Sequence, residues 1–363
     1  MSTWKNLTCI LFVLASLSLA AQFAPQPSPD AKYQVTVIGD VHFDALDFHT
    51  GDAPISAGRA RERERNLAMW KEASKKLLST AGKQTNGKSA FVIQLGDICQ
   101  GDADTPELQE KLLGTAFSTV KRYFPSLPLV VVKGNHDVRL LRSQNGNPPY
   151  QKAMLPLIAK ELHAKHLEDG NYAFRNGRDL FIAVDGFVGA EKVTEFVRKM
   201  LDKHKDTRHV VLLTHLPLLP VATGNPFWRL PAADEIAAML ESRNALVLAA
   251  HTHTYSLVER KSPRGRIVQL VTTSMGNAWS NGHALEPSMD WKQYVEAASA
   301  AQASKGEKQL NDFKLILGNG DFSGTIFKQK SGFTVLNFDD KSIQIRIFTD
   351  DSGTPAFLKK LKF

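Results

Sequence analysis

The sequence has almost no cysteine. Its 363 residues include only Cys9 and Cys99, and Cys9 lies in an apolar segment at the N-terminus. If that segment is removed, Cys99 has no partner, which excludes an internal disulfide bond. With so few thiols, a metal site in this chain has to use nitrogen and oxygen ligands.

A basic block and a long apolar run are also missing. The 45 basic and 37 acidic residues give a formal charge of +8 that is spread along the chain. This balance suits an anionic substrate, but without a basic cluster it argues against nucleic acid as a partner. The apolar stretch at residues 7–20 falls short of the ~20 residues that a membrane span needs.

The N-terminus has the outline of an export signal. Lys5 precedes the apolar stretch, and Ser18-Leu19-Ala20 offers small residues for cleavage. We therefore expect a signal peptide over residues 1–20 and a secreted or periplasmic protein with no stable membrane span after cleavage. A retained membrane anchor is the alternative. Residues 21–32, which contain three prolines, are expected to form a stiff linker.

Polar residues follow directly after several apolar runs. Val130–Val132 is typical of a fully buried strand, and Gly134 is expected to turn the chain sharply after it. This turn would present Asn135 and His136 at the end of a sheet, where open α/β sheets hold their ligands. Four further runs end in the same way, at Asp40 and His42, at Asp97, at His215, and at His251 and His253.

These residues form a set of potential metal ligands. Carboxylate, imidazole and carboxamide groups bind Mn, Fe, Zn, Ni or Co. Asp40 and His42 are two positions apart, as are His251 and His253, so in an extended chain the side chains of each pair point to one side. Side chains ~7 Å apart along a strand can share metals that lie ~3.5 to 4 Å apart, which predicts a dinuclear site.

The order of the motifs resembles that of the calcineurin-like metallophosphoesterase family. The matching motifs are Asp40-Val41-His42, Gly96-Asp97, Gly134-Asn135-His136-Asp137, His215 and His251-Thr252-His253. The resemblance spans residues 40–253 and is strongest to secreted bacterial members of the phosphodiesterase branch. It implies an α/β fold of two facing mixed β-sheets flanked by helices, a four-layer α-β-β-α sandwich.

The resemblance also implies a set of four ligands for each of the two metals. The first metal would take Asp40, His42, Asp97 and His253, and the second would take Asp97, Asn135, His215 and His251. Asp97 would bridge two divalent or trivalent ions, with Mn, Fe or Zn expected. A metal-bridging hydroxide would then attack phosphorus.

His136 is implied to be the catalytic residue, as an acid for the leaving group or as a phosphate binder. The alternative is a structural histidine beside a ligand. Asp137 is expected to orient the loop or a neighbouring ligand, or only to cap the loop. Protein phosphatases of the family have an Asp where this chain has Gln100. The orienting partner of His136 would then be Asp102 or Asp104, or absent.

The coarse layout is one large domain over residues 33–350, with 276–330 as a less regular insertion or lid and 351–363 as a C-terminal tail. A plain surface subdomain is the alternative for 276–330. Helices are predicted at 59–81, 106–122, 148–163 and 190–204 from apolar spacing and from Pro106. The charged run at 61–65 is expected to be solvated.

The predicted activity is hydrolysis of phosphate esters, with phosphodiesters preferred. A phosphomonoesterase on the same site is the alternative, followed by a metal-binding interaction scaffold without catalysis. Expected substrates are small phosphate esters, including nucleotides and lipid headgroups. Arg139 and Arg142 are candidate phosphate contacts or solvated residues, and His49 and His283 are candidates to lie near the substrate. The oligomeric state is left open.

Overall fold

The computed structural model describes residues 21–22, 32–49, 55–140, 145–275, 283–318 and 320–363. The expected signal peptide, most of the linker, Arg142 and the start of the expected insertion lie outside the described residues. Within the described ranges, no helix combines the length and the apolar character that crossing a membrane requires.

Fifteen strands are described. They are β1 (Ala21–Gln22), β2 (Tyr33–Ile38), β3 (Ser89–Gln94), β4 (Leu129–Val131), β5 (Tyr172–Asn176), β6 (Asp179–Ala183), β7 (Val210–Leu213), β8 (Ala245–Ala249), β9 (Ser256–Ser262), β10 (Gly265–Val271), β11 (Pro287–Asp290), β12 (Asp321–Phe327), β13 (Phe333–Asp339), β14 (Ser342–Phe348) and β15 (Phe357–Lys362). They form a nine-stranded sheet in the order β1-β5-β6-β7-β8-β10-β9-β12-β11 and a six-stranded sheet in the order β15-β14-β13-β2-β3-β4.

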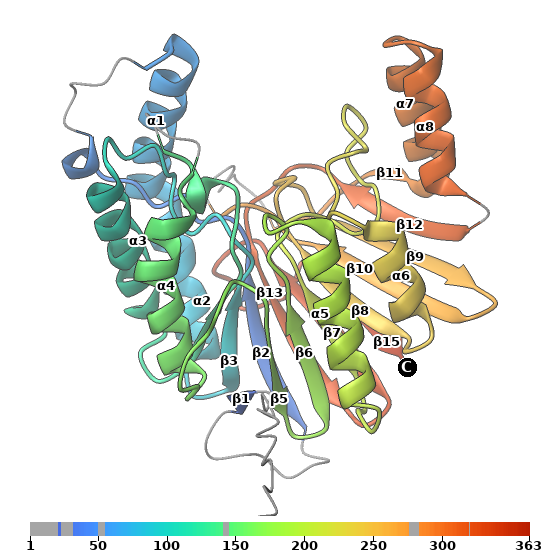
Figure 1. Ribbon diagram of the computed structural model, residues 1–363, viewed down its shortest axis with the longest axis horizontal. Helices are drawn as coiled ribbons and strands as arrows, with labels where there is room; N and C mark the ends of the chain where they lie inside the picture. The colour runs from blue at the N-terminus through green and yellow to red at the C-terminus, as the bar shows by residue number, and fades with distance from the viewer. Residues whose placement is uncertain (1–20, 23–31, 50–54, 141–144, 276–282, 319) are drawn as a thin grey trace, which may run out of the picture.

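Helices cover the outer faces of both sheets. The α-helices are α1 (Ala57–Met69), α2 (Lys75–Thr85), α3 (Pro106–Lys121), α4 (Asn147–Glu161), α5 (Ala190–Lys203), α6 (Ala233–Glu241), α7 (Trp291–Ala303) and α8 (Glu307–Leu317). Helices α2, α3 and α4 lie beside the six-stranded sheet, whereas α5 and α6 pack against the nine-stranded sheet (Figure 1). This arrangement confirms the predicted four-layer fold with two mixed sheets.

Aromatic side chains fill the space between the two sheets. Phe91 on β3 packs against Phe181 on β6, with ring centroids 5.1 Å apart, and Phe174 on β5 stacks on Phe181 at 5.0 Å. Phe338 on β13 also contacts Phe181. All four rings are buried, so the apolar area that they remove from water holds the sheets face to face.

The predicted helix at 59–81 is part of a longer one. Helix α1 continues through a π-helical turn, η2 (Trp70–Ser74), directly into α2. The hydroxyl of Ser56 caps its start by accepting from the backbone N–H of Arg59. Helix α3 begins at Pro106, as predicted, because proline needs no hydrogen-bond acceptor in the first turn.

The C-terminal third extends both sheets. Strands β9 and β10 form a hairpin, as do β13 and β14. Strand β12 pairs with β9, so residues 321–327 belong to the nine-stranded sheet, while α7 and α8 stand as a pair beside it (Figure 1). Residues 357–362, expected to lie in a tail, form β15 on the edge of the six-stranded sheet.

A buried ion pair of the nine-stranded sheet accepts a hydrogen bond from the six-stranded sheet, at the end opposite the ligand-bearing loops. Asp179, at the start of β6, accepts from the hydroxyl of Tyr33 on β2 at 2.7 Å and from Nε of Arg208 at 2.9 Å. The Asp179 side chain is fully buried and that of Arg208 is 4% exposed. The carboxylate therefore compensates a guanidinium charge that the chain has removed from water.

We expect Asp179→Asn to lower the free energy of unfolding by about 3 kcal/mol, because it leaves the Arg208 charge buried without its carboxylate partner. Urea unfolding followed by circular dichroism measures the change. As a control, Asp339→Asn removes a carboxylate from an exposed pair with Lys32 and should leave the unfolding midpoint nearly unchanged. Equal midpoints for both variants would contradict this account.

Candidate dinuclear metal site

The predicted ligands lie on loops at the carboxyl ends of five strands. Strands β2, β3 and β4 run parallel in the six-stranded sheet, and β7 and β8 run parallel in the nine-stranded sheet. The sheets pack face to face, so their strand ends meet at one end of the molecule. Open α/β sheets bind their ligands at the carboxyl ends of their strands, as we expected for this chain.

The local backbone differs from the extended geometry that we expected for the paired ligands. His42, His251 and His253 adopt φ angles of 48°, 69° and 54°, and Asp97 adopts 53°. All four are in the left-handed region, which residues other than glycine adopt at a cost of ~1 to 3 kcal/mol. The two-residue spacing therefore brings the side chains together through tight turns and not along a strand.

The glycines of the motifs make room for the ligands. A Cβ on Gly96 would lie 2.6 Å from Nδ1 of His215, and Gly96 has a φ of 92°. A Cβ on Gly134 would lie 2.1 Å from the backbone nitrogen of Asp97. Gly134 is thus required by the close approach of Asp97, whereas we expected a sharp turn.

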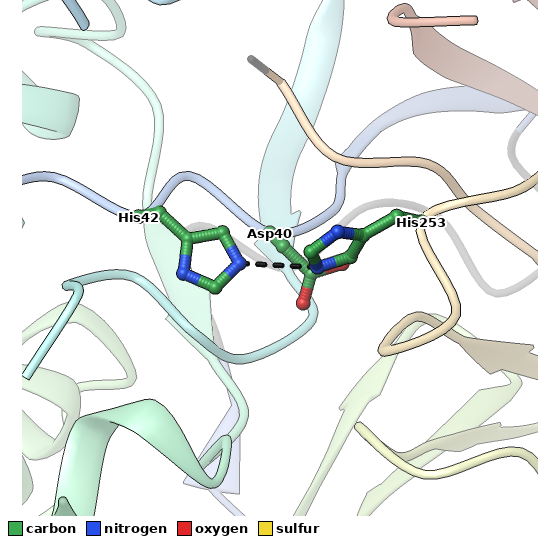
Figure 2. Close-up of side chains that lie close together, drawn as sticks. All are labelled: Asp40, His42 and His253. Atoms are coloured by element: carbon green, nitrogen blue, oxygen red, sulfur yellow. Dashed lines mark hydrogen bonds and ion pairs between the residues drawn. The ribbon is translucent and has the colours of Figure 1, made fainter. Parts of the chain in front are cut away.

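Asp40, His42 and His253 form the first cluster (Figure 2). Nε2 of His42 lies 3.1 Å from Nε2 of His253, and Nε2 of His253 lies 3.7 Å from Oδ2 of Asp40. Their ligand atoms all lie within 4.8 Å of one another. Oδ1 of Asp40 is buried with no hydrogen-bond partner among the described residues, an arrangement that a bound cation would make favourable.

Asp97, His215 and His251 form the second cluster, again with ligand atoms within 4.8 Å of one another. Nε2 of His215 lies 3.3 Å from Oδ2 of Asp97, 3.1 Å from Nδ1 of His251 and 3.0 Å from the amide oxygen of Asn135. The structure therefore brings Asn135 to the second cluster.

Asp97 stands between the clusters. Its Oδ2 atom lies 3.9 Å from Nε2 of His42 in the first cluster and 3.3 Å from Nε2 of His215 in the second. Its Oδ1 atom accepts from the backbone N–H of His136 at 2.7 Å. The carboxylate thus has one oxygen fixed by the backbone and the other facing both histidines.

Burial sets the protonation of the site. It lowers the pKa of His251 to about 3 and that of His253 to about 4, so both imidazoles are neutral at pH 7, the form that binds metals. Burial opposes protonation of His215 as well, but the Asp97 carboxylate outweighs it and raises the His215 pKa to about 9. Burial raises the pKa of Asp40 to about 8. Convergent oxygen and nitrogen atoms without a thiolate fit a pair of Mn, Fe or Zn ions.

Asp137 holds the loop that carries Asn135. Its Oδ2 atom accepts from the backbone N–H groups of Gly134 at 2.8 Å and Asp97 at 3.0 Å, and its Oδ1 atom accepts from that of Cys99 at 3.2 Å. The side chain is fully buried. These contacts link the loops after β3 and β4.

The imidazole of His136 contacts a backbone carbonyl, a partner that we did not expect. Its Nδ1 atom lies 2.8 Å from the carbonyl oxygen of Gln100, and Nε2 lies 3.3 Å from Nη1 of Arg139. The ring stands edge to face with His42 at 4.6 Å between centroids. His136 therefore adjoins the first cluster.

Arg139 is part of a charged network that reaches helix α1. Its guanidinium lies 2.7 Å from Asp102 and 3.3 Å from Glu62, and Arg59 lies 3.2 Å from Asp102. Glu62 lies within the run that we expected to be solvated, yet it is only partly exposed. No local signal in the sequence pairs Glu62 with Arg139, because 77 residues separate them.

Two other histidines are used elsewhere. Nε2 of His49 lies 2.7 Å from Oδ1 of Asp44 in a buried pair, and Nδ1 of His283 lies 2.9 Å from Oδ2 of Asp350. Both imidazoles thus pair with carboxylates outside the two clusters.

The sequence was compared with known proteins and structures. A model of the calcineurin-like phosphoesterase family matches residues 33–255. A dimetal phosphatase from Danio rerio shares the fold with a TM-score of 0.52 and 14% identity, covering 91% of this chain and 99% of that chain. PhoD gives a TM-score of 0.53 and 12% identity, covering 93% of this chain and 70% of that chain. No curated protein sequence matches.

Similarity at 12 to 14% identity establishes a common fold, whereas the family match covers more than half of the chain and includes every motif described above. The chain belongs to the calcineurin-like phosphoesterase family.

Proposed function

We propose that this metal-dependent phosphoester hydrolase prefers phosphodiesters and cleaves them at the two clusters that share Asp97. The observation that carries the proposal is the convergence of two carboxylates, one amide and four imidazoles within a few ångströms at the meeting point of the two sheets. Asp40, His42, Asp97 and His253 would hold one ion, and Asp97, Asn135, His215 and His251 the other.

The protein side chains prepare the site for this chemistry. A pair of bound cations supplies an acidic water at neutral pH and neutralises charge that develops on the entering and departing oxygens. Asp97 fixes the spacing of the two clusters through its contact with the His136 N–H. Neutral His251 and His253 offer lone pairs without first losing a proton, because burial keeps their pKa values low.

Charge balance supports the preference for diesters. Two divalent ions carry four positive charges, and Asp40 and Asp97 neutralise two of them. A nucleophilic hydroxide would neutralise one more, so the site would match the single charge of a diester. The nearby network adds nothing to this sum, because the charges of Arg59 and Arg139 are balanced by Asp102 and Glu62.

His136 is proposed as the acid for the leaving group. Its Nδ1 atom faces the Gln100 carbonyl, which leaves Nε2 as the nitrogen that can serve the substrate. A proton on Nε2 would break the contact between Nε2 and Arg139 and leave this N–H free to donate to the leaving group. Arg139 would keep its ion pairs with Asp102 and Glu62. Binding of the phosphoryl group by His136 is the alternative role.

A phosphomonoesterase is the second candidate function. Arg139 favours it, because its guanidinium lies 3.3 Å from His136 and could donate hydrogen bonds to the additional ionised oxygen of a monoester. Under either function, we propose that Mn, Fe or Zn is the native metal and that the chain acts after export, as its N-terminal sequence indicates.

Removal of metal should abolish hydrolysis. We expect chelation to eliminate turnover of bis(p-nitrophenyl) phosphate and added Mn²⁺ to restore it, with about two ions per chain by elemental analysis.

Asp97→Asn should lower both metal content and activity, because Asp97 contacts both clusters. Asp206→Asn, at a side chain that is 73% exposed, is the control. A folded, metal-loaded protein without turnover would instead favour a binding scaffold.

Replacement of His136 should reveal its role through the leaving group. We expect His136→Gln to slow cleavage of alkyl phosphodiesters by roughly 100- to 10,000-fold, the usual contribution of a general acid. The loss should be much smaller for p-nitrophenyl esters, because nitrophenolate leaves without a proton. His166→Gln, at an exposed position, is the matched control. Equal losses for both leaving groups would indicate phosphate binding instead.

The diester preference can be measured directly. We expect kcat/KM to be higher for bis(p-nitrophenyl) phosphate than for p-nitrophenyl phosphate at equal metal loading, because the site matches one negative charge. The two esters share the same leaving group, so the comparison reports the charge and the second substituent. A higher kcat/KM for the monoester would support the second candidate function.

A further inference from the structure

A cavity of about 760 Å³ opens beside the candidate metal site. Thr252 and Thr254 line it and alternate along the chain with His251 and His253. Trp228 also lines the cavity, and the centroid of its ring lies 5.3 Å from that of the His251 imidazole. A group bound in the cavity would therefore lie close to His251, one of the proposed metal ligands.

The walls of the cavity combine apolar and hydrogen-bonding groups. Met289 and Phe327 contribute apolar surface, while Thr223, Asn225 and Ser288 contribute hydroxyl and amide groups. An acyl chain would leave these polar groups without partners, which is unfavourable. The mixture suits a polar molecule that contains a ring. The volume lies within the ~300 to 1,000 Å³ that is typical of small-molecule sites.

Trp228 offers a surface for such a ring. Its side chain is 53% exposed, although tryptophan is one of the side chains that gain most from burial. The neighbouring Phe227 is 39% exposed but does not line the cavity. An exposed indole beside a cavity that contains hydrogen-bonding groups can stack on a planar base.

The cavity is also positively charged. Lys305 donates to the carbonyl oxygen of Gly224 at 2.5 Å and lies 3.4 Å from the amide oxygen of Gln302, both of which are uncharged acceptors. Lys328 is paired with Glu286 at 2.6 Å. None of the described residues that line the cavity is acidic. Lys305 thus contributes a positive charge that suits electron-rich oxygens of a ligand.

We propose that this cavity binds the nucleoside part of a phosphodiester, with the base against Trp228 and the phosphate at the two clusters. The inference rests on the proposed function and adds the substrate class. The cavity holds the alcohol that stays esterified or the one that departs, and in either case it supplies binding energy next to the reacting phosphate.

Two diesters with one leaving group test the inference. The p-nitrophenyl ester of thymidine 5′-phosphate and methyl p-nitrophenyl phosphate differ only in the second alcohol. With the Mn²⁺-loaded full chain, we expect kcat/KM to be about 5- to 150-fold higher for the thymidine ester, the range that stacking of one base provides. A ratio near one, with both esters hydrolysed, would overturn the inference and leave the proposed function intact.

Variants locate the effect in the cavity. Trp228→Ala should bring the ratio of the two kcat/KM values toward one, and Ser288→Trp should do the same by filling the cavity. Phe227→Ala is the matched control, because it removes a neighbouring exposed ring that does not line the cavity. Retention of the ratio in both cavity variants, or its loss in the control alone, would overturn the assignment of the cavity.

Binding separates this inference from the proposed function. Titration calorimetry with thymidine 5′-phosphate, glucose 6-phosphate and inorganic phosphate should show the nucleotide binding at least 5-fold more tightly than the other two ligands. If neither ester is hydrolysed, the proposed function fails, and tighter nucleotide binding would still support the cavity assignment. Equal affinity for the nucleotide and the sugar phosphate would overturn the cavity assignment, whatever the affinity for inorganic phosphate.

Discussion

The geometry of the site depends on the contacts that Asp97 makes through both its backbone and its side chain. Its backbone carbonyl accepts from the N–H groups of Val41 and His42, which fixes the loop after β2. Its side chain accepts from the N–H of His136 in the loop after β4 and lies 3.3 Å from His215 after β7. A single residue thus connects the two sheets where the potential ligands meet, and any displacement of Asp97 would disturb both clusters together.

The arrangement around Asp97 contains unfavourable interactions, and packing in the rest of the fold compensates their cost in free energy. Four of the potential ligands have left-handed backbone angles, and several carboxylates and imidazoles are buried close together. Each of these features costs free energy in isolation. The aromatic core between the sheets holds the strand ends in place, so the loops cannot relax separately. Bound cations would compensate the buried carboxylates and complete the site.

The resemblance to a known family implied the layers. Hydrophobic periods predicted the main helices and the apolar strand ends predicted the converging side chains, because both are local patterns. The sequence did not predict the left-handed turns at His42 and His251, since these angles depend on tertiary packing. The carbonyl of Gln100 was missed as the partner of His136 because backbone groups leave no signature in residue type. Glu62 and Trp228 were missed because their positions depend on how distant loops pack.

Strand β15 has a consequence for self-association. It forms the outer edge of the six-stranded sheet, and an exposed edge offers unpaired N–H and carbonyl groups to strands of other molecules. Lys359, Lys360 and Lys362 are exposed along this short strand, so a second copy docking there would bring like charges together. The lysines of β15 therefore disfavour edge-to-edge pairing, and removal of residues 357–362 would uncover the apolar strand β14.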